Sequence, residues 1–320
     1  MQALSLSMFT PAGRLLEGGL GTYYRAQSEA GEPVILFLLR SEPPSAEELA
    51  RLQQAHDLQR DVGRAPLSHE TQVLEPIAIV QGEDRVGLAL RHGDGEPLAH
   101  GLRRGALPVP VVLRLGIALA ELCGALHERG ARLGACGPEP ILLDEDAGDA
   151  APRVRILSLV PAMPAGGAQQ AGALSAAALP YAAPEQLRGG ADLTPAADLY
   201  SLGVLLYQAL CGALPFDSDD PAELLHAHLA RTPPPLGERA PAVPPLLARI
   251  VEKLLSKAPA ERYRTAHGLR DDLEQLDERL AAGAGTDLVD FVLGRSDRPE
   301  LLALALPQDA RGDEEQELLR

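Results

Sequence analysis

The sequence predicts an α+β protein of two lobes, a small β-rich lobe followed by a larger helical one. Strand-like segments joined by tight turns dominate residues 8–92, and helical periodicity dominates residues 93–278. A chain of 320 residues that is 46% hydrophobic can bury a core of this size. Strands followed by helices, rather than alternating with them, are typical of α+β proteins. Residues 279–320 are expected to be a linker or tail, partly disordered.

The small lobe is expected to begin as a β-meander. A glycine cluster that includes Gly18 and Gly21 separates the segments RLLEG and TYYRAQ, and a second turn leads into the apolar run Val34–Leu39. Short apolar and aromatic runs bounded by glycine indicate strands joined by tight turns. Two further strands are expected at residues 73–80 and 86–90.

One helix is expected inside the small lobe, between residues 45 and 62. Ser45 and Glu48 have the spacing of a capping box, in which each side chain binds the backbone N–H of the other residue. Three leucines lie on one expected face, at positions 49, 52 and 58. We therefore expect this face to pack against the sheet.

Within the helical lobe, the helical pattern begins near residue 108. Its first apolar stripe repeats at spacings of three and four residues, through Val112, Leu115, Leu119, Leu122 and Leu126. Residues 199–211 are apolar on nearly every face, which predicts a helix surrounded by protein. Two amphipathic helices are expected to close the lobe, around residues 247–254 and 269–276.

Composition argues against several classes of partner. The net charge is -16, from 29 basic and 45 acidic residues, whereas nucleic acids and anionic membranes are bound through clustered Lys and Arg. Three cysteines without a short paired spacing favour neither a disulfide framework nor a zinc site. The first residues lack the pattern of a secretory signal, so a cytoplasmic location is expected.

Three motifs carry a resemblance to a known family. LPYAAPEQLRG at 179–189 resembles the end of a protein kinase activation segment, and DLYSLGVLLYQALCGALPF at 198–216 resembles the helix after it. PAERYRTA at 259–266 resembles the late segment of the same domain. LLEGGLGTYYRA and LHERGARLGACGPEPILLDED are similar to the glycine-rich loop and the catalytic loop. The sequence therefore resembles bacterial Ser/Thr protein kinases over residues 8–278, which implies the two-lobed kinase fold.

The resemblance also shows which catalytic groups are replaced. Phosphoryl transfer in this family uses a strand lysine, a helix glutamate that orients it, a catalytic aspartate and two metal ligands. The corresponding positions are Phe37 for the lysine, Ala55 for the glutamate, Ala135 for the aspartate, and Pro140 and Ser158 for the metal ligands. These replacements imply a degenerate kinase, that is, a pseudokinase.

Two observations independent of alignment agree with this interpretation. The only lysines in the sequence are Lys253 and Lys257, so no lysine exists in the small lobe. Residues 156–184 contain no charged side chain, so no carboxylate follows the strand where a metal would bind. Mg²⁺ requires hard oxygen ligands, and the single hydroxyl of Ser158 does not replace a carboxylate.

Structural residues of the family are present. Glu185 and Arg262 match an ion pair that ties the activation segment to the helical lobe, and Asp198 matches the residue that anchors the catalytic loop. Removal of one partner from a buried ion pair typically costs about 3–5 kcal/mol. The resemblance therefore implies that the architecture is retained although the catalytic groups are replaced.

Nucleotide binding is a separate question. Gly18 and Gly21 could shelter a nucleotide, but Leu16 replaces the first glycine of the expected pattern, and a glycine pair in a hairpin is more often a turn. Phe37 and Tyr23 would fill the phosphate site with apolar bulk. We expect no cofactor, and any ATP to bind weakly and without metal. The acidic residues 144–146 fit a solvated turn better than a metal site.

The leading interpretation is a pseudokinase that acts as a regulatory or scaffolding module by binding other proteins, through the helical lobe or the loop at 158–184. The region FDSDDPAELLHAHLARTPPPLGERAPAVPP, followed by a tail with VLGRSDRPELL, resembles large bacterial proteins in which a kinase-like module precedes an ATPase module and a sensor histidine kinase. Partners from such pathways are therefore expected, and neither nucleic acid nor membrane. The alternatives are a divergent, active Ser/Thr kinase and a sensor of small molecules.

Overall fold

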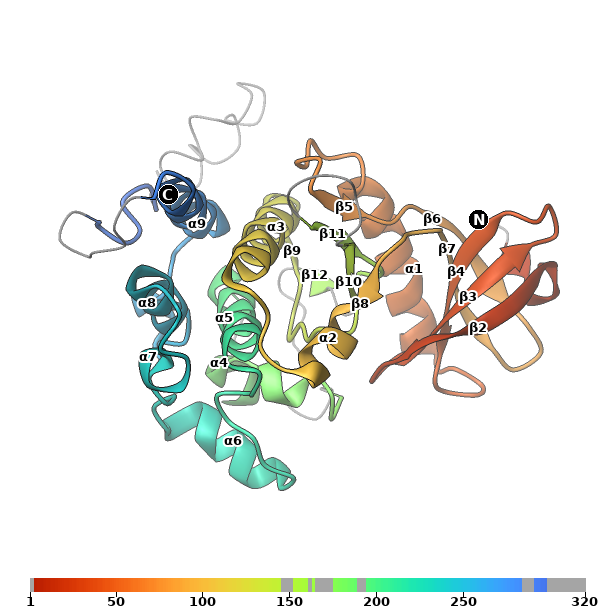
Figure 1. Cartoon of the computed structure of the whole chain (residues 1–320). Coiled ribbons are helices and arrows are strands. Elements are labelled where there is room, and N and C mark those ends of the chain that lie inside the picture. The colour runs from red at the N-terminus through yellow and green to blue at the C-terminus, as the bar shows by residue number, and fades with distance from the viewer. Residues whose placement is uncertain are drawn as a thin grey trace, which may run out of the picture.

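A computed structural model describes residues 3–144, 152–160, 163–164, 175–188, 194–283 and 291–297 of the chain. A β-sheet and one helix form the small lobe, and a group of helices forms the large lobe (Figure 1). This arrangement confirms the α+β, two-lobed fold that the order of strand and helix patterns predicts.

The main sheet has six strands in the order β1-β6-β7-β4-β3-β2. These are β1 (Leu4–Ser5), β2 (Phe9–Glu17), β3 (Gly21–Ser28), β4 (Pro33–Leu39), β6 (Pro76–Gln81) and β7 (Val86–Arg91). β2, β3 and β4 form the predicted antiparallel meander, and the register places Tyr23 of β3 opposite Phe37 of β4. β4 is buried along nearly its whole length, because one face packs on α1 and the other under the N-terminal segment.

Helix α1 (Ala46–Val62) begins at Ser45 with the predicted capping box, in which Ser45 and Glu48 bind each other's backbone N–H groups. The predicted apolar face needs a correction. Leu49 is 40% exposed, whereas the buried residues on this helix include Leu52, Ala55 and Gln59. Small and polar residues thus share the buried face, which a pattern based on leucine alone does not detect.

Two smaller sheets accompany the main sheet, and the first of them joins the lobes because β5 of the small lobe pairs with β11 of the large lobe. The first contains β5 (Thr71–Val73), β8 (Glu96–Pro97), β10 (Ile141–Asp144) and β11 (Arg153–Ile156), and the second pairs β9 (Ala131–Arg132) with β12 (Met163–Pro164). Asp144 ends β10 and is buried, and its carboxylate binds Arg155 at 2.5 Å. The expected solvated turn is therefore wrong for Asp144, while residues 145 and 146 lie outside the described ranges.

The helical lobe is built around α3 (Val109–Glu128) and α5 (Pro195–Cys211), which pack against each other. The other helices are α2 (Leu98–Arg104), α4 (Pro184–Arg188), α6 (Pro221–Ala230), α7 (Leu236–Arg239), α8 (Pro245–Leu254) and α9 (Ala266–Ala281). α5 is buried on almost every side, as predicted, and it ends at Gly212, whose φ of 72° suits glycine. α3 is long and apolar enough to cross a membrane, but 78% of the relevant window is buried inside the protein, as in the core helix of a globular domain.

Three larger apolar clusters hold the lobes together, beside two small ones in the helical lobe. The largest fills the helical lobe, and another lies between the outer face of the sheet and the N-terminal segment. The remaining cluster joins the lobes, because it combines small-lobe residues such as Leu16 and Phe37 with Leu142, Leu157 and Val160 of the large lobe. This inter-lobe cluster sets the position of the functional site.

Candidate functional site

The inter-lobe site is formed by the β2–β3 turn, β4, α1, the loop before β10 and the residues after β11. The kinase resemblance assigns phosphate transfer to this region, and all the replaced positions lie in these five segments. The sequence separation between the segments is large, so only the fold brings them together.

Phe37 fills the position expected for a phosphate lysine. Its side chain is 2% exposed, and its ring lies against the ring of Tyr23 with centroids 4.8 Å apart. The Tyr23 hydroxyl lies close to the side chain of Ser158, which is fully buried after β11 and accepts a hydrogen bond from the N–H of Val160. Burial raises the pKa of Tyr23, so the phenol stays neutral. Phe37 and Ser158, two of the replaced positions, therefore both lie beside the buried side chain of Tyr23.

The buried face of α1 presents Ala55 and Gln59 to the same site. Ala55 packs in the inter-lobe cluster and offers no charge. The Gln59 amide nitrogen donates to the carbonyl oxygens of Leu74, at 2.7 Å, and Leu157, at 3.0 Å, while its amide oxygen accepts from the backbone N–H of Leu159, at 3.0 Å. This amide ties α1 to the segment that follows β11 without an ion pair.

The loop before β10 carries Ala135 and Pro140. Ala135 is buried in a small apolar cluster with Ala182 and Leu187, so the position expected for a catalytic aspartate is covered. The carbonyl oxygen of Pro140 accepts from the N–H of Leu157 at 2.7 Å. Proline at this position contributes a backbone bond between two strands and no side-chain ligand.

Glu139, in the same loop, reaches the glycine turn. One of its carboxylate oxygens accepts from the N–H of Gly19 at 3.0 Å. A Cβ on Gly18 would lie 2.8 Å from that oxygen, and a Cβ on Gly21 would lie 2.2 Å from the carbonyl oxygen of Leu38. The two candidate nucleotide-binding glycines therefore allow close packing of the turn on the protein itself. The carboxylate occupies a backbone N–H of the kind that phosphate groups bind.

Asp198, near the start of α5, anchors the loop before β10. Its carboxylate accepts from the N–H groups of Leu133, at 2.9 Å, and Gly134, at 2.8 Å, and forms a further bond of 2.7 Å with His127. Cys123 lies close enough to complete a possible three-ligand metal cluster. Burial raises the pKa of this thiol well above its ordinary value, and only the thiolate is a good ligand. The chemistry of the cluster fits an anchor for the loop better than a metal site.

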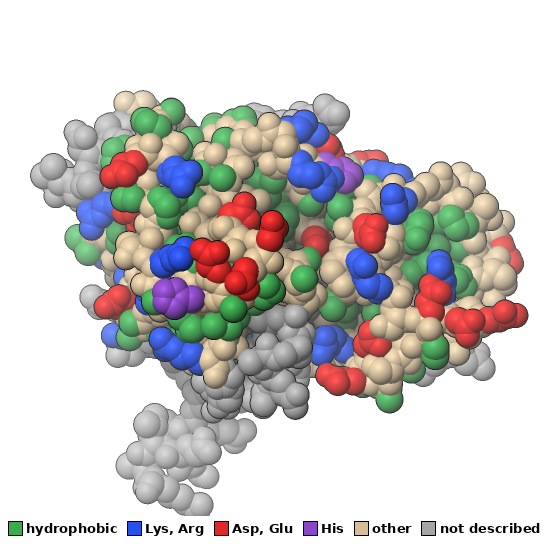
Figure 2. Space-filling model, turned by 90° about the horizontal axis from the view of Figure 1, so that it is seen from below, with side chains coloured by type: hydrophobic (Ala, Val, Ile, Leu, Met, Phe, Trp, Pro, Cys, Tyr) green, Lys and Arg blue, Asp and Glu red, His purple; other side chains and the backbone are tan. Residues whose placement is uncertain are grey.

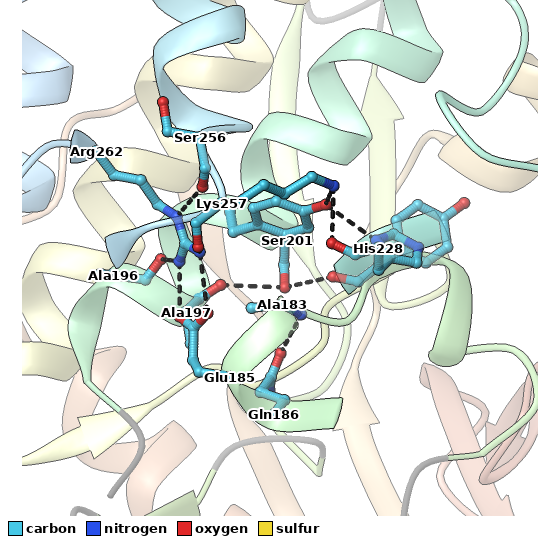
Figure 3. Close-up of polar contacts among 12 residues, drawn as sticks. Ala183, Glu185, Gln186, Ala196, Ala197, Ser201, His228, Ser256, Lys257 and Arg262 are labelled. Atoms are coloured by element: carbon cyan, nitrogen blue, oxygen red, sulfur yellow. Dashed lines mark hydrogen bonds and ion pairs between the residues drawn. The ribbon is translucent and has the colours of Figure 1, made fainter. Parts of the chain in front are cut away.

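Glu185 and Arg262 form a bidentate ion pair at 2.6 and 2.9 Å (Figure 3). The Arg262 side chain is fully buried and also donates to the carbonyl oxygens of Ala196, Ser256 and Lys257. Its guanidinium lies 4.8 Å from the centre of the Tyr200 ring. The structure thus brings together the two residues that the kinase resemblance pairs. Each guanidinium nitrogen of Arg262 donates to at least one acceptor.

A neighbouring group extends this network. The Lys257 ammonium donates to the carbonyl oxygens of Ala227 and His228 and lies 4.5 Å from the centre of the Phe216 ring. Burial, reinforced by the charge of Arg262, lowers the pKa of Lys257 to about 8. Burial, followed by the charge of Lys257, lowers the pKa of His228 to about 4. These groups tie α6 to the segment after α8.

Two residues of the site were missed by sequence reasoning, Glu139 and Gln59. Glu139 is the only acidic residue between Glu128 and Asp144, so its isolation was a possible signal. Gln59 follows Leu52 by seven residues and Ala55 by four, which places it on the buried helical face. A polar residue on such a face indicates a specific hydrogen-bond partner.

Similarity to known proteins agrees with this geometry. The protein kinase domain family matches residues 166–273. The serine/threonine-protein kinase pkn2 of Myxococcus xanthus is 32% identical over 249 residues, which cover 72% of this chain and 30% of that protein. The hybrid signal transduction histidine kinase G of Dictyostelium discoideum is 49% identical over 84 residues, 26% of this chain and 2% of that protein. The chain spans less than half the length of either relative.

A solved structure has the same fold. The kinase domain of Mycobacterium tuberculosis PknI, crystallised as a double mutant, superposes with a TM-score of 0.62 and 21% identity, covering 86% of this chain and 98% of that one. At this identity the likeness concerns the fold. Together with the sequence relatives and the matched family, it identifies the chain as a protein-kinase-like domain related to the bacterial Ser/Thr protein kinases.

Proposed function

We propose that this domain does not transfer phosphate and acts as a pseudokinase, a regulatory or scaffolding module that binds other proteins. One observation carries the proposal. The Phe37 ring, packed on Tyr23 within the inter-lobe cluster, occupies the position where a cation would contact phosphate. An apolar ring there offers no stabilisation to the charge that develops during phosphoryl transfer.

The electrostatics of the site support the same proposal. The carboxylate of Glu139 is held at the glycine turn, where it repels a polyphosphate instead of attracting it. Its negative charge also contributes to the raised pKa values of Tyr23 and Cys136, for which burial is the main cause. We therefore propose that the site has no cofactor and that any ATP binds weakly and without metal.

We also propose that the partner is a protein and that the domain acts in the cytoplasm. On the face shown in Figure 2, acidic and basic side chains are interspersed, which favours neither nucleic acid nor an anionic membrane as partner. The helical lobe and the loop at 158–184 remain the proposed contact regions, although residues 161–162 and 165–174 of the loop lie outside the described ranges. Similarity to a hybrid histidine kinase supports a partner from such a pathway.

Thermal melting with nucleotide tests the proposal. We expect the melting temperature to be the same with ATP and Mg²⁺, with ATP and a chelator, and without nucleotide, and we expect no transfer from labelled ATP. A ligand at a hundred times its Kd would stabilise the fold by about 2.7 kcal/mol, which melting detects easily. Magnesium-dependent stabilisation accompanied by phosphate transfer would overturn the proposal.

A divergent, active Ser/Thr kinase is the second candidate. Relation to active kinase families favours it, as does the complete Glu185–Arg262 pair. The same nucleotide measurement separates the two candidates. A small-molecule sensor, the third possibility, predicts stabilisation by a compound other than a nucleotide. Such stabilisation should be lost when Tyr23→Ala removes one wall of the site, and a screen without any stabilising compound would remove this candidate.

A further inference from the structure

Residues Phe291–Asp297 lie against the helical lobe, although the sequence places them in the expected linker or tail. Asp297 binds the start of α9 through both carboxylate oxygens. One accepts from the N–H of Arg264 at 2.7 Å, and the other accepts from the N–H and the hydroxyl of Thr265, at 2.8 and 2.9 Å. Thr265 itself caps α9 by accepting from Gly268. Asp297 thus adds a negative charge to the positive end of a 16-residue helix.

A second contact lies inside the lobe. The N–H of Gly294 donates at 2.7 Å to the buried carboxylate of Asp272, which also accepts from the hydroxyl of Tyr263 at 2.7 Å. Gly294 has a φ of +69°, a conformation that suits glycine. An exposed, mobile tail would need neither feature.

The third contact is apolar. Phe291 is 8% exposed and belongs to the main core of the helical lobe, with Leu293 packed beside it. The guanidinium of Arg279, near the end of α9, lies 5.1 Å from the centre of the Phe291 ring. The segment therefore contacts α9 at both ends of the helix.

The glycine at position 268 is an independent indication that the segment docks on α9. Glycine inside a helix is unfavourable relative to alanine. A Cβ at this position, however, would lie 2.6 Å from the Cβ and 2.8 Å from the Cα of Asp297. The first turn of α9 thus lacks a side chain at the place where the segment crosses it.

We propose that Phe291–Asp297 is a clasp and that α9 with Tyr263–Thr265 is its receptor. The clasp fixes residues 291–297 on the helical lobe, and its release would free the backbone N–H groups of Arg264 and Thr265 and expose the ring of Phe291. The partner of this surface is accordingly the segment Phe291–Asp297 of the same chain. The pattern that the receptor recognises is Phe-x-x-Gly-x-x-Asp.

Hydrogen exchange of the full chain tests the contacts directly. Asp297→Ala and Phe291→Ala should each raise the exchange of the Arg264, Thr265 and Gly294 amides at least tenfold, because these amides would lose their acceptors or their burial. Arg295→Ala is the matched control, since that side chain is exposed in the same segment and should leave exchange unchanged. Parent-like exchange at Arg264 and Thr265 in Asp297→Ala would overturn the proposal.

The direction in which Gly268→Ala changes the melting temperature provides a second test. Without a docked segment, alanine would raise the melting temperature through its better helix propensity. With the clasp in place, we expect the melting temperature to fall, because the new methyl group displaces Asp297. In a chain that already carries Phe291→Ala and Asp297→Gly, the same substitution should become neutral or stabilising. A higher melting temperature for Gly268→Ala alone would show that the clasp does not form.

Discussion

At the scale of single residues, buried charge separates the anchors from the surface pairs. The guanidinium of Arg262 is fully buried and depends on Glu185, whereas Arg231 and Glu223 form an ion pair whose side chains are about half exposed. Exposed pairs contribute little to stability because water screens them, and a stranded buried charge is costly. The same kind of contact therefore has very different consequences at the two places.

Glu185→Ala should lower the free energy of unfolding by about 3–5 kcal/mol, because Arg262 would keep a buried charge without its partner. Denaturant titration measures the loss. Glu223→Ala is the control and should cost less than about 1 kcal/mol. Equal midpoints for the parent chain and Glu185→Ala would mean that the pair is not an anchor.

The low pKa of His228, about 4 against an ordinary 6.5, predicts a dependence on pH. Between these values the unfolded chain takes up a proton that the folded chain does not, so stability falls as the pH drops from 6.5 to 4. The contribution of this group is at most about 3 kcal/mol.

Comparison of the parent chain with a variant that lacks the His228 imidazole isolates that contribution. His228→Gln should flatten the curve of stability against pH in this window, whereas the exposed His226→Gln on the same helix should reproduce the parent slope. Urea titrations at several pH values compare the three chains. Identical slopes for His228→Gln and the parent would contradict the assignment.

At the scale of elements, α1 is joined to the segment after β11 by a neutral amide. The three bonds of Gln59 connect α1, the residue after β5 and the residues after β11. An amide holds these elements at any pH and without nucleotide, because neither donor nor acceptor is ionised. The position of α1 is thereby fixed by the fold alone.

Gln59→Leu should destabilise the protein by about 1–3 kcal/mol, since two carbonyl groups and one N–H would stay buried without partners. Gln54→Leu, on a less buried part of the same helix, is the control and should be nearly neutral. Chemical denaturation followed by circular dichroism measures both. A neutral Gln59→Leu would indicate that water or a shift of α1 replaces the amide.

At the scale of the whole molecule, the inter-lobe cluster joins the small lobe to the large one. Leu16, Tyr23 and Phe37 pack in the same group as Leu142 and Val160, so the two lobes share buried apolar surface. A shared core of this kind couples the unfolding of two regions. The site that the kinase resemblance assigns to nucleotide is consequently part of the structural core.

Phe37→Ala should therefore lower the stability of the whole domain by about 3–5 kcal/mol through lost burial and a cavity. Calorimetry of the parent chain should show one transition. Loss of the ring should move that transition to lower temperature or split it in two, with the small lobe melting first. An unchanged transition would mean that the cluster does not link the lobes.

The sequence by itself determined the order of the two lobes and the place of several elements, such as α1 and α5, because the spacing of apolar residues and the capping box at Ser45 act locally. It also indicated the replaced catalytic positions and the pairing of Glu185 with Arg262. These last two inferences rested on the resemblance to the kinase motifs.

Only the tertiary structure decided what the replaced residues do. The contact of Phe37 with Tyr23, the bond from Gly19 to Glu139 and the crossing of Gly268 by Asp297 all join segments distant in the chain or on different elements. The same holds for Asp144, which was expected in solvent and lies buried against Arg155. Local patterns specify helices and strands. The partner of a side chain depends on how those elements pack, and a short stretch of sequence does not specify that packing.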